Sequence, residues 1–129
     1  MRELIDHKVN PANDRLTVAS TGEAGSGGAY HRYVISGFDD TKNPVGNAWD
    51  DCECIVLFQN GPIAEVGVNG VTHEALLAIL ADRLRCFQNG PFANQFNATA
   101  LQHIEAAQEA LQARTRERMN RGVEGTHNV

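Results

Sequence analysis

The sequence has few aromatic residues, no long apolar run and no strongly apolar segment near its start. Its 129 residues include five phenylalanines, two tyrosines and one tryptophan. No stretch approaches the roughly 18 consecutive apolar residues of a membrane span. The opening segment MRELIDHKVN lacks the apolar core of a signal peptide. We therefore expect a soluble, cytosolic protein with no membrane partner, built as one compact domain or a domain with an appendage.

Cysteine is also scarce, and the three thiols form no familiar ligand pattern. Cys52, Cys54 and Cys86 are an odd number without a secretion signal, which argues against a disulfide framework. The spacing of Cys52 and Cys54 is too tight for a usual zinc site, even with His31 or His73 as helpers. We expect no metal and no cofactor, and Cys54 is better explained as a buried strand residue.

Excess positive charge is absent too, since the formal net charge is −5. Residues 1–71 contain 5 basic against 10 acidic side chains, whereas residues 72–129 contain 6 against 6. Four arginines of the second region lie within eight positions, namely Arg114, Arg116, Arg118 and Arg121. This bunching favours a local anion site over the broad basic surface that DNA or RNA needs.

Motifs for catalysis are missing as well. The sequence has no nucleophile elbow, no phosphate-binding P-loop and no Gly-x-Gly-x-x-Gly before a helix. We therefore expect a binding protein and not an enzyme.

Two alternatives stay open at this point. A phosphodiesterase could use histidines as acid–base groups, although no paired H-x-T motif is present. The candidates are His31, His73, His103 and His127. A protein–protein interaction module, such as an inhibitor of another protein, could instead use the acidic segments 39–40 and 50–53 to meet a basic partner.

Residues 1–71 have the pattern of strands and turns. Four β-prone segments lie at 15–20, 30–36, 53–59 and 63–68. Asn60-Gly61 predicts a tight hairpin turn between the last two. The Gly-rich segment 21–28 and the segment 39–50 are expected to be loops. The first region is therefore predicted to be a small antiparallel β-sheet.

Residues 72–129 have a helical pattern instead. Thr72 has the properties of an N-cap, and apolar residues then follow at spacings of three and four, namely Leu77, Leu80, Leu84 and Phe87. Asn89-Gly90-Pro91 ends this helix, and a second helix is expected from near Phe92 to about Asn120, with Gly122 as its stop. So short a connection folds the helices into an antiparallel hairpin, and the fold class is α+β.

The second helix directs its arginines to different faces. At about 100° per residue, its apolar stripe contains Leu101, Ile104 and Leu111, with alanines 100 and 107. Arg118 falls inside this stripe, Arg114 and Arg121 fall at its edge, and Arg116 falls on the solvent side. Three arginines are thus predicted to continue the buried face. Arg114 and Arg118 are four apart, so their two guanidinium groups suit a diphosphate. Caps of the helix end or salt bridges between subunits are the alternative roles.

Two residues near the turn add the features of a nucleotide site. The Phe87 ring would stack on a base, and the Asn97 amide would bond to a base edge. However, Asn97 and Arg114 are separated by roughly 25 Å along the helix. One subunit cannot bring both ends to one small ligand, so a composite site predicts a homodimer.

Two blocks of the helical region are specific enough to compare with known families. The block DRLRCFQNGPF with Asn97 after it, and the closing segment RTRERMNRGVEGTH, resemble the hairpin domain of two families of phage anti-defence sponges. These are the anti-CBASS sponge and the first Thoeris anti-defence sponge. The preceding β region with AYHRYVISGF is similar to the Thoeris type. NQFN and Cys86 depart from the usual residues beside the expected site, which bears on ligand preference.

The resemblance implies a protein that captures, without cleaving, the glycocyclic ADP-ribose signal of a bacterial TIR protein. It assigns ring stacking to Phe87, an amide contact to Asn97 and phosphate contacts to Arg114 and Arg118. It also implies binding between subunits, in the cytoplasm of the infected bacterial host. Some relatives form hexamers with separate sites for CBASS cyclic di- or trinucleotides. Two further residues are candidates for such a second anion site, Arg85 and Arg121.

Overall fold

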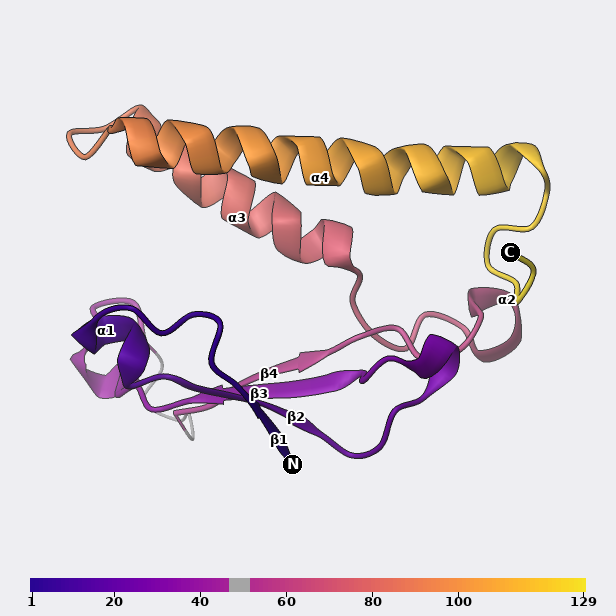
Figure 1. The fold of residues 1–129 in the computed structure, drawn as a ribbon, viewed down its shortest axis with the longest axis horizontal. Helices are drawn as coiled ribbons and strands as arrows, with labels where there is room; N and C mark the ends of the chain where they lie inside the picture. Colours follow the sequence, from indigo (N-terminus) through magenta and orange to yellow (C-terminus); the bar gives the residue numbers. More distant parts are fainter. Residues whose placement is uncertain (47–51) are drawn as a thin grey trace. The chain divides into compact units, whose positions relative to one another are not determined.

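The strands lie in the first half of the chain and the two long helices lie in the second half (Figure 1). The computed structural model describes residues 1–46 and 52–129. Contacts divide it into two compact units, Met1–Asn60 and Gly61–Val129, called here the β unit and the hairpin unit. The α+β class predicted from the sequence is confirmed. The domain boundary predicted between residues 71 and 72 stays a prediction.

The β unit contains a four-stranded antiparallel sheet. Its strands are β1 (Arg2–Leu4), β2 (Thr17–Thr21), β3 (Arg32–Ser36) and β4 (Cys54–Leu57), in the order β1-β2-β3-β4. The register pairs Ala19 of β2 with Val34 of β3, and Val34 with Ile55 of β4. Three of these strands lie where the sequence predicts them, whereas β1 was not predicted. A short helix, α1 (Pro11–Asp14), and two 3-10 turns, η1 (Ser26–Gly28) and η2 (Asp40–Lys42), lie in the connections.

Few side chains of this sheet are buried. Ala19 and Ser20 at its centre are buried, whereas Ile55 and Leu57 on β4 are about half exposed. Cys54 is exposed, so its prediction as a buried strand residue was wrong. The reason is that β4 lies at the edge of the sheet and its residues have neighbours on one side only.

Gly37 fixes the close approach of two chain segments in the β unit. It follows β3 directly and has a φ of +94°. A Cβ atom there would lie 2.1 Å from the carbonyl oxygen of Arg15, which precedes β2. Only a residue without a side chain fits such a backbone position.

The strand predicted at 63–68 is absent, and a one-turn helix, α2 (Ile63–Val66), stands in its place. Pro62 before it is buried and cannot donate to a strand ladder, while its fixed φ suits the start of a helix. Gly67, with a φ of +76°, ends the turn. The Asn60-Gly61 pair therefore leads into a helix, and the predicted hairpin was wrong.

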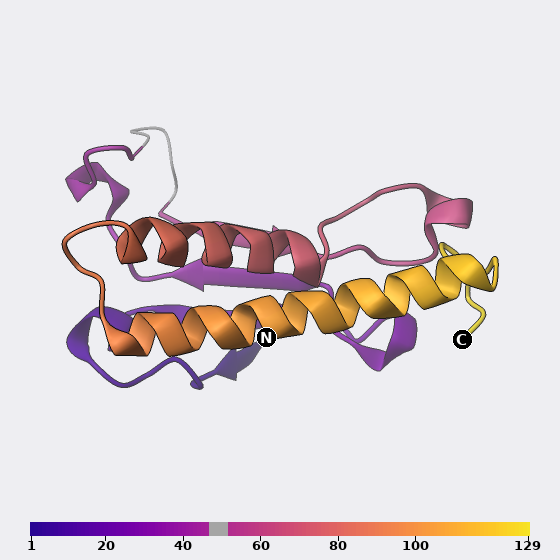
Figure 2. The same ribbon diagram turned by 90° about the horizontal axis from the view of Figure 1, so that it is seen from above.

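Two longer helices form the predicted antiparallel hairpin, α3 (His73–Gln88) and α4 (Gln95–Asn120) (Figure 2). The Thr72 hydroxyl accepts the Ala75 N–H at 3.2 Å, which confirms the predicted N-cap. Gly122 with a φ of +73° confirms the predicted stop. The second helix begins at Gln95 and not near Phe92.

The later start of α4 follows from its cap. The Asn94 side chain accepts the Asn97 N–H at 2.8 Å. Gln88 exchanges two hydrogen bonds of 3.1 Å with the Asn94 backbone, which anchors the connection to the end of α3.

Residues at spacings of three and four make the helix–helix interface. On α4 these half-buried or buried residues are Leu101, Ile104, Gln108, Leu111, Thr115 and Arg118. Alanines 100 and 107 of the predicted stripe are exposed, as is Leu80 on α3. Two helices have only one mutual face, so the rest of a wide apolar stripe stays uncovered within one chain. Within the described ranges, no helix is long and apolar enough to cross a bilayer.

Candidate functional site

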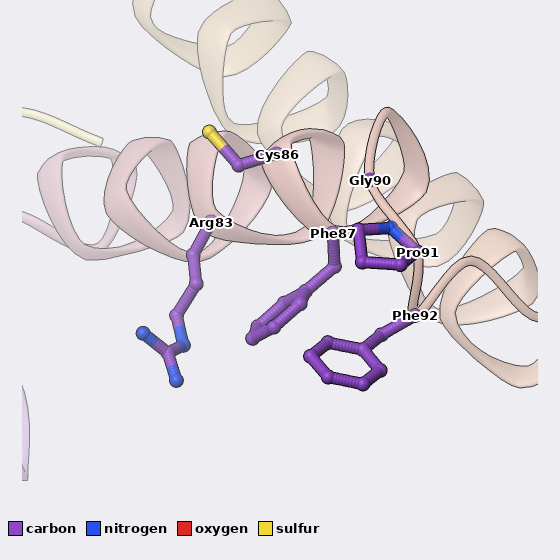
Figure 3. A pocket seen from close by; sticks show the side chains of 6 residues that line it. All are labelled: Arg83, Cys86, Phe87, Gly90, Pro91 and Phe92. Carbon is purple, nitrogen blue, oxygen red and sulfur yellow. The ribbon is translucent and has the colours of Figure 1, made fainter.

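The turn end of the hairpin carries an open pocket lined by aromatic rings (Figure 3). Its volume is about 300 Å³, and it is lined by Arg83, Cys86 and Phe87 of α3 and by Gly90, Pro91 and Phe92 of the connection. The Phe87 and Phe92 ring centroids lie 6.4 Å apart at an interplanar angle of 56°. The Arg83 guanidinium carbon lies 5.0 Å from the centroid of the Phe87 ring.

Local structure explains why these side chains meet. Arg83 and Phe87 are four residues apart on α3, so they lie on the same helix face. The Phe92 carbonyl accepts a hydrogen bond of 3.0 Å from the Asn94 side chain, which ties the second ring to the cap of α4. Phe87 is half-buried and Phe92 is 69% exposed, so both rings have surface available to a ligand.

Asn97 lies in the first turn of α4, on its half-buried face. Its backbone N–H is used by the Asn94 cap. Among the described residues its side-chain amide has no hydrogen-bond partner, which leaves that amide available at the turn end where the sequence predicts a base contact.

Arg118 is buried at the other end of α4, with a residue exposure of 6%. Its guanidinium donates to the Glu124 carboxylate at 3.0 Å and to the carbonyls of Val123, Thr126 and Asn128 at 2.9, 3.1 and 2.6 Å. An arginine has five N–H donors, so the segment after α4 uses four of them. The prediction that Arg118 continues the buried face is confirmed.

The other closing arginines are exposed. Arg114 and Arg116 make no ion pair within the part of the chain that the structure describes. Arg121 pairs with Glu117 one helical turn earlier and donates to the Val129 carbonyl. The prediction that Arg114 and Arg121 share the buried face was wrong, because the segment after α4 encloses the Arg118 side chain and leaves Arg114 and Arg121 exposed.

The four predicted ligand-binding residues do not meet within one chain. Phe87 and Asn97 lie at the turn, while Arg114 and Arg118 lie toward the C-terminal end of α4. Because α4 is one continuous helix, Asn97 and Arg114 are separated by roughly 25 Å.

The two candidates for a second anion site are each engaged with a carboxylate. Arg85 donates to Glu105 across the hairpin at 3.1 Å. Arg121 donates to Glu117 at 3.1 Å. They lie at opposite ends of the hairpin, so one chain does not assemble them into one site.

Three possible metal ligands lie together in the β unit, namely Asp39, Asp40 and Cys52, with donor atoms within 4.8 Å of one another. Asp39 has a structural role, because it caps η2 by accepting the Thr41 hydroxyl and N–H. These hydrogen bonds lower the pKa of the Asp39 carboxyl from its ordinary value of 3.8. The Cys52 thiol donates to Asp40 at 3.4 Å. Part of the acidic segment 50–53 lies outside the described residues.

The histidines considered for catalysis lie in different settings. The His31 ring contacts the Ser26 carbonyl at 3.1 Å, and the His127 ring lies 3.5 Å from the Glu65 carboxylate. His103 is exposed on α4.

Sequence reasoning missed Arg83 and Phe92. A signal for Arg83 was present, since it stands four residues before Phe87 on a predicted helix. The helical pattern placed Phe92 at the start of the second helix, so it did not show that Phe92 lies in the connection between α3 and α4.

Comparison with known proteins places this geometry in a family. The family described as "Acb2/Tad1, hairpin domain" matches residues 51–116, which is just over half of the chain. A protein of Bacillus phage SBSphiJ7 named "Thoeris anti-defense 1" is 50% identical over 72 residues. That match covers 56% of this chain and 51% of the relative, so the chain spans about half the length of the curated relative it matches. The chain belongs to the Acb2/Tad1 hairpin family.

Proposed function

We propose that this protein is a phage Thoeris anti-defence sponge. It binds glycocyclic ADP-ribose without cleaving it and so keeps the signal from its effector in the cytoplasm of the infected bacterium. The relative's name, "Thoeris anti-defense 1", supports the defence system, and the family match supports the hairpin as the binding element.

The observation that carries the proposal is the open aromatic pocket at the turn. Phe87 and Phe92 present rings that stack on a base, and the unpartnered Asn97 amide suits a base edge. At the other end of α4 the exposed Arg114 suits a phosphate, which an arginine fork binds through two hydrogen bonds. Arg118 joins that contact with its one remaining donor, or with more when residues 123–128 move away from it.

Because the two ends are separated, we propose that the functional unit is a homodimer. A second copy running antiparallel would set its arginine end beside the turn of the first. Exposed apolar residues on the hairpin unit give such a contact surface to bury, namely Ile79, Leu80, Phe92 and Phe96. A hexamer built from such dimers would create additional contacts, and Arg85 and Arg121 are the candidates there for CBASS cyclic di- or trinucleotides.

Capture without cleavage requires affinity and no reacting groups. The pocket lining supplies rings, a thiol and a guanidinium, and no carboxylate or imidazole lies among the six lining residues. A general acid–base pair would need at least one such group at the ligand. The ligand is therefore expected to leave the protein unchanged.

The test is calorimetric titration of the full chain with glycocyclic ADP-ribose. The complex is then heated to denature the protein, and the released ligand is analysed. We expect tight binding, at least one ligand for two chains, and recovery of the intact ring. Phe87→Ala and Arg114→Ala should each weaken binding by about tenfold or more. Arg116→Ala is the matched control for Arg114→Ala, because it removes another exposed arginine of α4.

Each result has a separate meaning. Recovery of a linear product would replace the sponge with an enzyme. No heat with this ligand, together with heat from cyclic di- or trinucleotides, would assign the protein to CBASS signals. No binding of any of these ligands would contradict the proposed function.

A further inference from the structure

We propose that Arg83 is a further ligand-binding residue, which covers the Phe87 ring in the free protein and holds an anionic group of the ligand in the complex. The inference rests on the proposed function, since it adds a residue to the same turn-end site.

The first support is geometric. Figure 3 shows the Arg83, Phe87 and Phe92 side chains projecting to the same side of the hairpin, with the guanidinium beside the Phe87 ring. The 5.0 Å distance from the guanidinium carbon to the ring centroid is within the range of a cation–π contact. A base that stacks on this face of Phe87 therefore meets Arg83 first.

The second support is electrostatic. The hairpin unit contains six arginines, and three of them are engaged with carboxylates: Arg85, Arg118 and Arg121. Within residues 61–129, which the structure describes throughout, Arg83 has no carboxylate partner. Arg83 is also the member of the unpaired set that lies at the turn, because Arg114 and Arg116 lie far along α4. The turn therefore holds a guanidinium without an ion pair among the described residues, beside two aromatic rings.

The third support is chemical. A nucleotide combines a flat ring with a negatively charged group a few bonds away. An exposed cation–π contact stabilises only weakly, whereas a guanidinium–phosphate pair can form two charge-assisted hydrogen bonds. Once a base is stacked on the Phe87 ring, it is favourable for Arg83 to leave its cation–π contact and pair with a phosphate. Arg83 then holds the anionic group while Phe87 holds the base.

The test compares Arg83→Gln, Arg83→Lys and Arg116→Gln in titrations with glycocyclic ADP-ribose at low and high salt. Arg116 is a matched control, since it is an exposed arginine on α4 without an ion pair among the described residues. We expect Arg83→Gln to weaken binding by about tenfold and to reduce the salt dependence of Kd. Arg83→Lys should recover part of the affinity, and Arg116→Gln should change Kd less than about twofold.

The outcomes separate this inference from the proposed function. If the wild-type chain does not bind the ligand, both fall together. If the wild-type chain binds and Arg83→Gln binds equally well, Arg83 is not a ligand-binding residue and the proposed function stands. Equal losses for Arg83→Gln and Arg116→Gln would show a general charge effect and overturn the inference. A loss of affinity that accompanies a lower unfolding midpoint, with no recovery in Arg83→Lys, would assign Arg83 a structural role and also overturn it.

Discussion

The β unit and the hairpin unit differ in how they use arginine. Residues 1–60 contain five basic and nine acidic side chains, whereas residues 61–129 contain six and seven, and all six basic residues are arginines. On the sheet, Arg2 donates to Ser20 and lies over the Tyr30 ring, and Arg32 donates to Thr21. These two arginines serve the fold of their own unit.

In the hairpin unit some arginines stabilise the fold, and others are exposed without a carboxylate partner among the residues described. Arg118 is enclosed by the segment after α4, while Arg83 and Arg114 have no carboxylate partner in the described chain. Arginine keeps its charge at all relevant pH values and presents a planar fork that matches phosphate. A count of arginines therefore does not locate a candidate anion site, whereas the partners of each guanidinium show which arginines are left unpaired.

The largest effect is expected from breaking the β unit alone. Gly37→Ala puts a Cβ atom against the Arg15 carbonyl oxygen at a positive φ, so it should lower the free energy of unfolding of this unit by about 3 kcal/mol. Segment-resolved hydrogen exchange should show faster exchange in β2 and β3 and unchanged exchange in α3 and α4.

The matched control for this substitution is Gly22→Ala. Its φ is +77°, but no atom lies within 4 Å of the new Cβ, so only the backbone strain of about 1 kcal/mol remains. Equal loss of protection in the helices of Gly37→Ala would contradict the division into two units.

A smaller effect is expected at Arg118, which stabilises the fold of the hairpin unit as Arg2 and Arg32 stabilise the sheet. Arg118→Ala removes four hydrogen bonds, so chemical denaturation should show a loss of about 2 kcal/mol in unfolding free energy. Arg116→Ala, at an exposed site, should change it by less than about 0.5 kcal/mol. Equal unfolding free energies for the two variants would mean that residues 123–128 are not held by Arg118.

The smallest effect is a pH dependence confined to the β unit. The hydrogen bonds from Thr41 lower the folded pKa of Asp39 below its ordinary value of 3.8. The stabilisation is therefore complete above the unfolded pKa and is lost as pH falls through the folded value. Acid titration followed by hydrogen exchange should show that the difference between wild type and Asp39→Asn shrinks below pH 3.8.

Thr41→Val is the control for that titration, because it removes the hydroxyl that donates to Asp39 and keeps the N–H. It should retain part of the pH dependence. A difference between wild type and Asp39→Asn that persists unchanged at low pH would contradict the assignment.

The start of α3 and the end of α4 were predictable because local chemistry decides them, whereas the start of α4 was predicted near Phe92 and lies at Gln95. Thr72 and Gly122 act through their own side chain or φ, so a single sequence shows them. The strand at 63–68 was mispredicted, since the alternation of apolar residues there was weaker evidence than Pro62 before it. Local rules therefore succeed where one signal acts alone, and they fail where two signals compete in the same few residues.

The site was predictable only in part. Phe87 and Asn97 were located at the turn, since helical spacing gives their position along the hairpin. The partners of Arg118 were not, because residues 123–128 form an irregular turn without periodicity. The exposure of Arg114 was also mispredicted, since a helical wheel shows an apolar stripe and not which part of it a neighbour covers.

The unbroken length of α4 has a consequence for how this chain could change over evolution. Between Asn97 and Arg114 the helix sets both the distance and the angle between the turn and the arginine end. Inserting one residue would rotate one end against the other by about 100°, whereas inserting seven would leave an offset of about 20°. For the proposed composite site we therefore expect substitutions on the outer face to be tolerated more readily than insertions or deletions. The length of this part of the chain would then be constrained more tightly than its sequence.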